Sequence, residues 1–166
     1  MVEKDLVFTG KVKQKGIFAF KELYKFCYVW LVDKEYWVVE KGYTEKIGAE
    51  GKDIEVHWEA TRKISDYFRF YLKIDWMILG MKNVEVEKNG VKVGMNKGYP
   101  EIKITAILEK DYEHRWENKA VLKFLRGLYD RYIIRARIEK YEDQIHEEGD
   151  EFLAQVKSFL AIEGTR

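Results

Sequence analysis

The 166-residue sequence contains one cysteine, Cys27, and one proline, Pro100. A single cysteine excludes an internal disulfide, so we expect the chain to reside in a reducing compartment. No run approaches the roughly 18 apolar residues of a membrane-spanning helix, and residues 1–5 lack the basic start and apolar stretch of a signal peptide. These absences predict one soluble, cytoplasmic domain spanning residues 1–166 with no transmembrane segment.

The sequence also lacks an excess of one charge. Lys and Arg number 30 against 29 Asp and Glu, which gives a net charge of +1. A balanced charge argues against a dedicated nucleic-acid binder and against strong electrostatic attachment to an anionic membrane. Lys and Glu dominate the charged residues while Asn and Gln are sparse, a composition that leans toward thermophilic or archaeal proteins.

Motifs that carry chemistry are missing as well. The sequence has no phosphate-binding loop, no dinucleotide fingerprint and no G-x-S-x-G nucleophile elbow. His57, His114 and His146 are scattered and do not form the paired Cys/His pattern of a zinc site. Cys27 lies on the apolar side of a predicted helix, where it acts as a small hydrophobic residue. We therefore expect no cofactor and no metal.

The apolar residues that are present alternate in two periods. A period of two predicts strands over residues 6–12, 37–47, 54–64, 68–78 and 102–108, and Asn89-Gly90 predicts a hairpin turn. A period of three to four predicts a helix over residues 20–31 and helical structure from residue 117 onward. We expect Gly149 to interrupt that structure and Asp150 to cap a separate helix over residues 150–162.

This order predicts an α+β fold in which a curved antiparallel sheet of about six or seven strands follows an N-terminal strand and helix. A long C-terminal helical region packs on one face of the sheet. The order of elements resembles the helix-grip domains of the START-like and pathogenesis-related-protein-like families, and the chain is similar in character to archaeal proteins of unknown function. The helix-grip resemblance implies an apolar cavity between the sheet and the C-terminal helix.

Large aromatic residues dominate the predicted inner face of the sheet. The strand pattern places Trp37, Val39, Tyr43 and Ile47 on one face, and an inward-phased Arg62 offers a cation for a polar head group. The predicted ligand-binding residues are Trp37, Tyr43, Trp58, Arg62, Phe70 and Trp76. They indicate a non-catalytic binding domain for an apolar or amphipathic small molecule. The alternative is that the rings fill a packed core and that Arg62 reaches solvent at the sheet edge.

Two other functions remain open. The apolar stripe of Phe152, Val156, Phe159 and Leu160 favours an interaction protein that binds a homo-oligomeric or other protein partner through its C-terminal helices.

The third hypothesis is that the protein is an enzyme of unknown class. Its first catalytic candidates are Asp111, Glu113 and His114, carboxylates beside a histidine that suit acid–base chemistry. Acidic residues at this place also stabilise the start of a helix. The arginine-rich stretch over residues 129–137 suits phosphate contacts, but its interleaved acids offer local ion pairs instead.

Overall fold

The computed structural model describes residues 3–113 and 120–164, which form an α+β fold. The strands are β1 (Glu3–Lys13), β2 (Gly16–Phe18), β3 (Trp37–Gly48), β4 (Gly51–Lys63), β5 (Phe68–Lys88) and β6 (Val91–Lys110). The helices are α1 (Phe20–Asp33), α2 (Ala120–Leu128), the π-helical turn η1 (Tyr129–Ile133) and α3 (Arg135–Gly164). Among these described helices, none is both long enough and apolar enough to cross a membrane.

The described strands form one six-stranded antiparallel sheet in the order β1-β6-β5-β4-β3, and the short β2 also pairs with β6. Successive strands from β3 to β6 are neighbours, and β6 then brings the chain back beside β1. The turn between β5 and β6 has φ values of 52° at Asn89 and 79° at Gly90, as a type I′ turn requires. The predicted α+β fold with a curved antiparallel sheet is confirmed.

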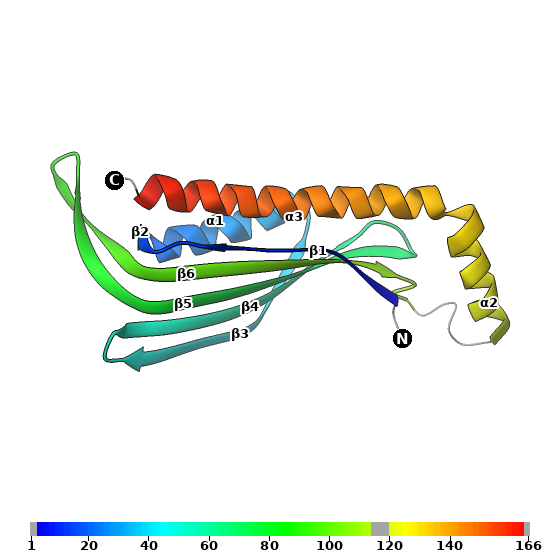
Figure 1. The fold of residues 1–166 in the computed structure, drawn as a ribbon, viewed down its shortest axis with the longest axis horizontal. Coiled ribbons are helices and arrows are strands. Elements are labelled where there is room, and N and C mark those ends of the chain that lie inside the picture. Colours follow the sequence, from blue (N-terminus) through cyan, green and yellow to red (C-terminus); the bar gives the residue numbers. More distant parts are fainter. Residues whose placement is uncertain (1–2, 114–119, 165–166) are drawn as a thin grey trace.

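The helices α1 and α3 cover the inner face of the sheet, with α3 running along its length (Figure 1). On this face the alternating residues of β5 are buried, and they meet buried residues of both helices. The buried side chains include Phe68, Phe70, Leu72, Ile74, Trp76 and Ile78 of β5, Leu23, Cys27 and Leu31 of α1, and Ile145, Phe152, Val156 and Leu160 of α3. Each large apolar side chain buried in this way contributes roughly 1.5–3 kcal/mol to folding.

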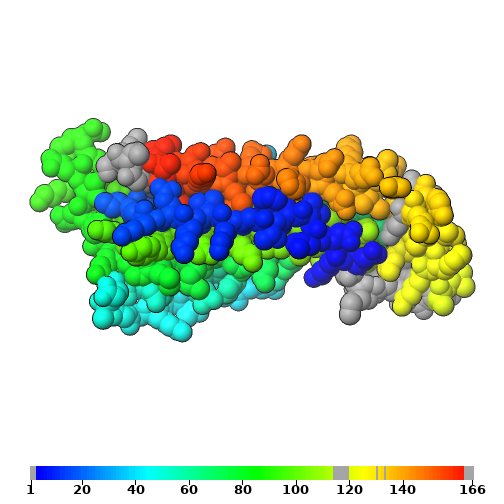
Figure 2. Space-filling view, in the orientation of Figure 1, coloured from blue at the N-terminus to red at the C-terminus, as the bar shows by residue number. Residues whose placement is uncertain are grey.

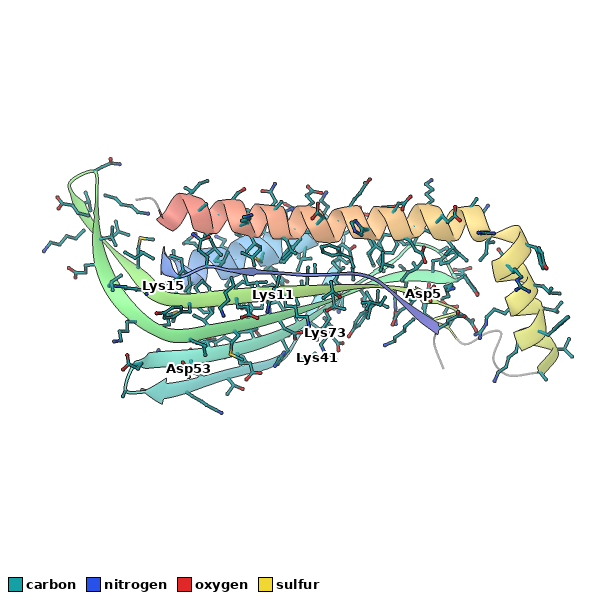
Figure 3. All side chains as sticks on the ribbon, in the orientation of Figure 1. Asp5, Lys11, Lys15, Lys41, Asp53 and Lys73 are labelled. Atoms are coloured by element: carbon teal, nitrogen blue, oxygen red, sulfur yellow. The ribbon has the colours of Figure 1, made fainter. Side chains whose placement is uncertain are left out.

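The outer face carries the intervening residues of each strand, and these are mostly charged or polar. Oppositely charged neighbours pair across strands, as in Lys11 with Glu101 at 3.5 Å and Lys41 with Glu59 at 3.6 Å. Figure 3 labels Lys11, Lys41 and Lys73 among these side chains. Alternation of an apolar inner face with a polar outer face is the pattern expected of an antiparallel sheet packed on one side.

A bulge in β3 changes which face its residues occupy. The register with β4 shifts between Glu40 and Gly42, so Val38 and Tyr43 lie opposite the inner-face residues of β4 while Trp37 lies on the outer face. Trp37 exposes 74% of its surface there. The prediction that Trp37 shares a face with Tyr43 is wrong, because one extra residue in a strand inverts the alternation that follows it.

The predicted break at Gly149 is also wrong, because α3 continues without interruption from Arg135 to Gly164. Gly149 is buried where α3 crosses β1, and a Cβ at this position would lie 2.7 Å from Cδ1 of Phe8. The glycine therefore permits a close helix–strand contact instead of ending the helix. Residues 150–162 belong to the same helix as residues 135–149.

Candidate functional site

A line of glycines crosses three neighbouring strands where the sheet bends. Gly51 begins β4, Gly80 lies within β5 and Gly98 lies within β6. The φ values of 123° at Gly51 and 60° at Gly80 lie in the region that favours glycine. A Cβ on Gly51 would lie 2.7 Å from the carbonyl oxygen of Met81, and one on Gly98 would lie 3.1 Å from that of Leu79. Glycine is required here because the backbones approach too closely for a side chain.

The bend turns the far half of the β5–β6 hairpin out of the plane of the sheet. The register between β5 and β6 shifts between Leu79 and Lys82, and such irregularities bend strands. The carboxylate of Asp53 accepts a hydrogen bond of 2.9 Å from the backbone N–H of Gly80, which holds the bend against β4. Figure 1 shows the hairpin rising toward the C-terminal end of α3.

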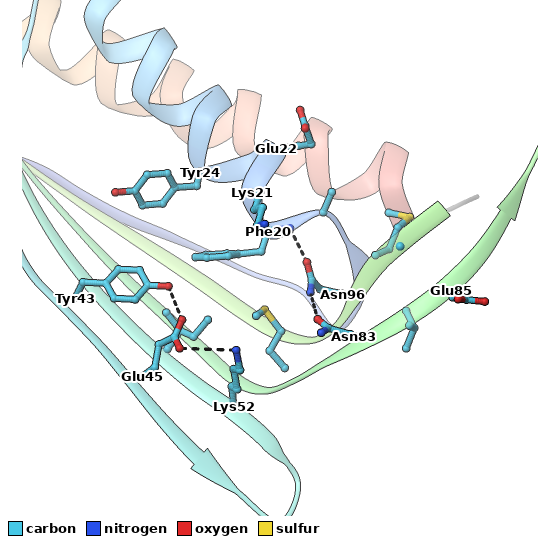
Figure 4. Close-up of a pocket in the computed structure, with 16 residues that line it drawn as sticks. Phe20, Lys21, Glu22, Tyr24, Tyr43, Glu45, Lys52, Asn83, Glu85 and Asn96 are labelled. Atoms are coloured by element: carbon cyan, nitrogen blue, oxygen red, sulfur yellow. Dashed lines mark hydrogen bonds and ion pairs between the residues drawn. The ribbon is translucent and has the colours of Figure 1, made fainter. Parts of the chain in front are cut away.

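The bend leaves an open cleft of about 990 Å³ between the start of α1, the β3–β4 hairpin and the raised β5–β6 hairpin (Figure 4). Its apolar lining consists of Ala19, Phe20, Tyr24, Ile54, Met81, Val84 and Met95. Its polar lining includes Lys21, Glu22, Tyr43, Glu45, Lys52, Asn83, Glu85 and Asn96. The cleft therefore combines an apolar floor with polar groups of both charges.

Asn96 joins one wall of the cleft to the start of α1. Its side-chain oxygen accepts a 3.0 Å hydrogen bond from the backbone N–H of Phe20, and its amide nitrogen donates a 3.0 Å bond to Asn83. The capping residue of α1, Ala19, has no side chain that can accept from an unpaired N–H of the first helical turn. Asn96 supplies that acceptor from a distant strand, which fixes the helix end at the edge of the cleft.

The opposite wall carries a tyrosine–carboxylate–lysine group. The hydroxyl of Tyr43 donates to Glu45 at 2.8 Å, and Lys52 lies 3.8 Å from the other oxygen of Glu45. Burial and the hydrogen bond to Glu45 raise the pKa of Tyr43 to about 12. Burial and a hydrogen bond to Glu40 raise the pKa of Tyr24 to about 12 as well. Both phenols are therefore neutral donors near neutral pH.

The buried indole of Trp76 packs against the two aromatic rings, Phe20 and Tyr24, that line the cleft. The ring of Trp76 lies 6.3 Å from that of Phe20 and 5.9 Å from that of Tyr24, measured between centroids. Its Nε1 is buried and has no hydrogen-bond acceptor among the described residues. An unsatisfied buried donor costs about 1–3 kcal/mol of folding free energy, so the Trp76 indole N–H lowers stability beside the cleft.

Of the six predicted ligand-binding residues, Tyr43 lines this cleft. Trp58, Phe70 and Trp76 lie on the inner face but expose at most 1% of their surfaces, and the rings of Trp58 and Trp76 are 5.2 Å apart. These three side chains form part of the packed core between the sheet and the helices. Trp37 lies on the outer face, away from the core.

Arg62 points inward, as its strand phase predicts, and meets a carboxylate of its own chain. Its Nη2 donates to both oxygens of Glu148 on α3 at 2.9 Å and 3.1 Å, and its Nη1 donates to the carbonyl oxygen of Lys34 at 2.6 Å. The guanidinium also lies 4.7 Å from the ring centroid of Tyr36. Burial, followed by the hydrogen bond to Glu148, raises the pKa of Tyr36. These contacts tie β4 and the end of α1 to α3.

The predicted interaction stripe packs within its own chain. Phe152, Val156 and Leu160 expose at most 2% of their surfaces against the sheet and α1. Phe159 is half-buried, and its ring stacks on that of Phe26 with centroids 5.2 Å apart. In this fold the stripe packs α3 against the sheet and α1.

The three catalytic candidates are only partly described. Asp111 is buried with φ of 51°, and its Oδ2 lies 3.4 Å from Nη1 of Arg126 on α2. Glu113 is exposed. His114 lies outside the described residues. Asp111 therefore holds α2 against the end of β6 through an ion pair.

A histidine on the outer face lies between two carboxylates. Nδ1 of His57 is 2.7 Å from Asp75, and Nε2 is 3.2 Å from Glu55. The hydrogen bond to Asp75 raises the pKa of His57 above its ordinary value of 6.5. The two carboxylates face opposite ring nitrogens, so they do not converge on one point. Within residues 3–113 and 120–164, no group of three His, Cys, Asp or Glu side chains is arranged to hold a metal ion.

Comparisons of the chain with protein-family models, with characterised proteins and with solved structures found no match. The candidate site therefore depends on geometry alone. Sequence patterns missed the cleft residues Phe20, Lys52, Asn83 and Asn96. The signal that leads to them is Gly80 within β5 and Gly98 within β6, because a glycine inside a strand marks a bend or a close approach.

Proposed function

We propose that the protein is a non-catalytic binding domain that holds an amphipathic small molecule in the cleft beside the start of α1. The observation that carries this proposal is the open cleft of about 990 Å³ with an apolar floor and polar walls. Ligand pockets typically have volumes of about 300–1,000 Å³ and combine apolar linings with a few placed polar groups. The cleft lies at the upper end of that range.

The lining favours a molecule with two chemically different ends. Phe20, Met81 and Met95 offer an apolar surface at the base of the cleft, and methionine side chains adapt to varied shapes. Lys52 and Glu45 on one wall offer a cation and an anion to a polar group. The glycine-dependent bend supports the proposal further, because it shapes the cleft from rigid strands instead of from a loop.

Substitution of Val84 by tryptophan tests the proposal. Val84 lines the cleft on the raised hairpin, so a larger ring there is expected to fill the space that a ligand needs. We expect the dissociation constant for anilinonaphthalene sulfonate, an amphipathic fluorescent anion, to rise about tenfold or more, which corresponds to roughly 1.4 kcal/mol. Fluorescence titration of the wild-type and variant proteins measures this change.

Val91→Trp is the matched control, because Val91 exposes 63% of its surface near the tip of the same hairpin and does not line the cleft. Its dissociation constant is expected to equal that of the wild type. Equal weakening by both variants, or unchanged binding by Val84→Trp, would show that the probe binds outside the cleft and would contradict the proposal. The circular dichroism and the thermal midpoint of each variant show whether its fold is retained.

A further inference from the structure

The segment formed by α2 and η1 presents an apolar stripe to solvent. Val121, Phe124, Leu125, Leu128 and Tyr132 recur at spacings of three and four residues, so they lie along one side of the helix. Phe124 exposes 67% of its surface and Tyr132 exposes 72%. A stripe of this kind usually faces a protein core, and here it faces away from the chain's own body.

The opposite side of the segment fixes this orientation. Nη1 of Arg126 lies 3.4 Å from Asp111, and Nη2 lies 3.9 Å from Glu3. The ring of Tyr129 lies 6.0 Å from that of Tyr67. Figure 2 shows the segment at one end of the molecule, and Figure 1 places the elements that form the cleft toward the opposite end. The segment is thus anchored by polar and aromatic contacts while its apolar side remains exposed.

Basic residues gather beside the stripe. An open recess of about 590 Å³ next to α2 is lined by Lys110, Lys123, Arg126 and Arg131 together with Glu3. Residues 120–137 contain five basic residues against one acidic residue, whereas the whole chain has a net charge of only +1. Residues 120–137 therefore carry a local excess of positive charge beside the exposed apolar stripe, in which Arg126 pairs with Glu3 and Asp111 and Arg135 pairs with Glu139.

We propose that α2 and η1 dock on an anionic phospholipid surface. Phe124, Leu128 and Tyr132 would enter the boundary between head groups and acyl chains, and Lys123 and Arg131 would contact lipid phosphates. An exposed apolar face flanked by Lys and Arg is the pattern of helices that lie in a membrane interface. A second copy of the chain fits less well, because a twofold contact through this surface would bring two basic regions together.

Flotation with phospholipid vesicles tests this docking. Vesicles of equal parts phosphatidylcholine and phosphatidylserine are expected to bind the protein, and binding is expected to weaken as salt is added. Phe124→Ser removes an exposed ring that supplies contact area, so its affinity is expected to fall about tenfold or more. Lys123→Glu is expected to lower affinity about fivefold or more, because each basic residue near such a surface contributes on that scale.

Matched controls use exposed residues at the other end of the domain. Ile47 exposes 84% of its surface on β3, and Lys46 beside it is exposed, so Ile47→Ser and Lys46→Glu are expected to bind as the wild type does. Equal binding to vesicles of phosphatidylcholine alone would overturn the proposal, as would absence of binding to the anionic vesicles. A dimer in sedimentation that Phe124→Ser dissociates would assign the stripe to a second copy instead.

Discussion

Arg62→Ala is expected to lower the free energy of unfolding by about 2–3 kcal/mol, less than the roughly 3–5 kcal/mol for one partner of a fully buried ion pair, because Arg62 and Glu148 are partly buried. The side chains of Arg62 and Glu148 each expose 12% of their surfaces, and two hydrogen bonds join them. The substitution leaves the Glu148 carboxylate without its cation at a partly buried position. It also removes the donor to the carbonyl oxygen of Lys34 and the stacking on Tyr36.

Urea denaturation of Arg62→Ala, Glu148→Ala and the double variant measures this effect. The double variant is expected to lose less stability than the sum of the two single variants, because the second substitution removes a charge that is already unpaired. Arg135→Ala is the control, since Arg135 pairs with Glu139 on the exposed surface of α3. That pair is worth about 0.3–0.5 kcal/mol. A loss below about 1 kcal/mol for Arg62→Ala would contradict a stabilising role for this partly buried pair.

Gly149→Leu is expected to lower the free energy of unfolding by about 2–3 kcal/mol through overpacking. A Cβ at this position would already lie 2.7 Å from the ring of Phe8, and a leucine side chain needs still more room between α3 and β1. The gain in helix propensity from replacing glycine, about 1 kcal/mol, offsets part of the clash and is included in the expected value.

Gly127→Leu is the matched control, because Gly127 also lies in a helix and a Cβ added to it would meet open space among the described residues. This variant is expected to gain up to about 1 kcal/mol from helix propensity alone. Thermal and urea unfolding of the two variants therefore separate propensity from packing. Stabilisation by both substitutions would contradict the close contact of α3 with β1.

Periodicity predicted the elements that repeat regularly. The alternation from Phe68 to Ile78 identifies a strand, the three-to-four spacing from Phe20 to Leu31 identifies a helix, and Asn89-Gly90 identifies the turn between β5 and β6. The inward phase of Arg62 was also predicted, but its partner was not. Glu148 lies 86 residues away, and no local pattern indicates a pairing at that distance.

Irregular positions were predicted less well. The bulge between Glu40 and Gly42 puts Trp37 on the opposite face from Tyr43, and the alternation of apolar residues in the sequence does not reveal the extra residue. Gly149 follows the pattern of a helix end, yet its role depends on Phe8 packing from the far end of the chain. In both cases a tertiary contact overrides the local signal.

The candidate cleft depends on contacts between strands that the sequence does not align. Gly51, Gly80 and Gly98 are separated by up to 47 residues and come together only once the register of β4, β5 and β6 is known. The strand pattern places Trp58, Phe70 and Trp76 on the inner face, where they pack as core. The space for a ligand arises farther along the same sheet, where the bend separates the hairpins.

The methionine methyl groups provide the most direct test of the cleft as a binding site. Met81 and Met95 line the cleft, whereas Met77 is exposed on the outer face of β5. NMR spectra of protein labelled at these methyl groups, titrated with anilinonaphthalene sulfonate, are expected to show saturable shifts of Met81 and Met95 with Met77 unchanged. Shifts of Met77 alone, or no shift of Met81 and Met95 at saturation, would contradict the assignment of this cleft as the binding site.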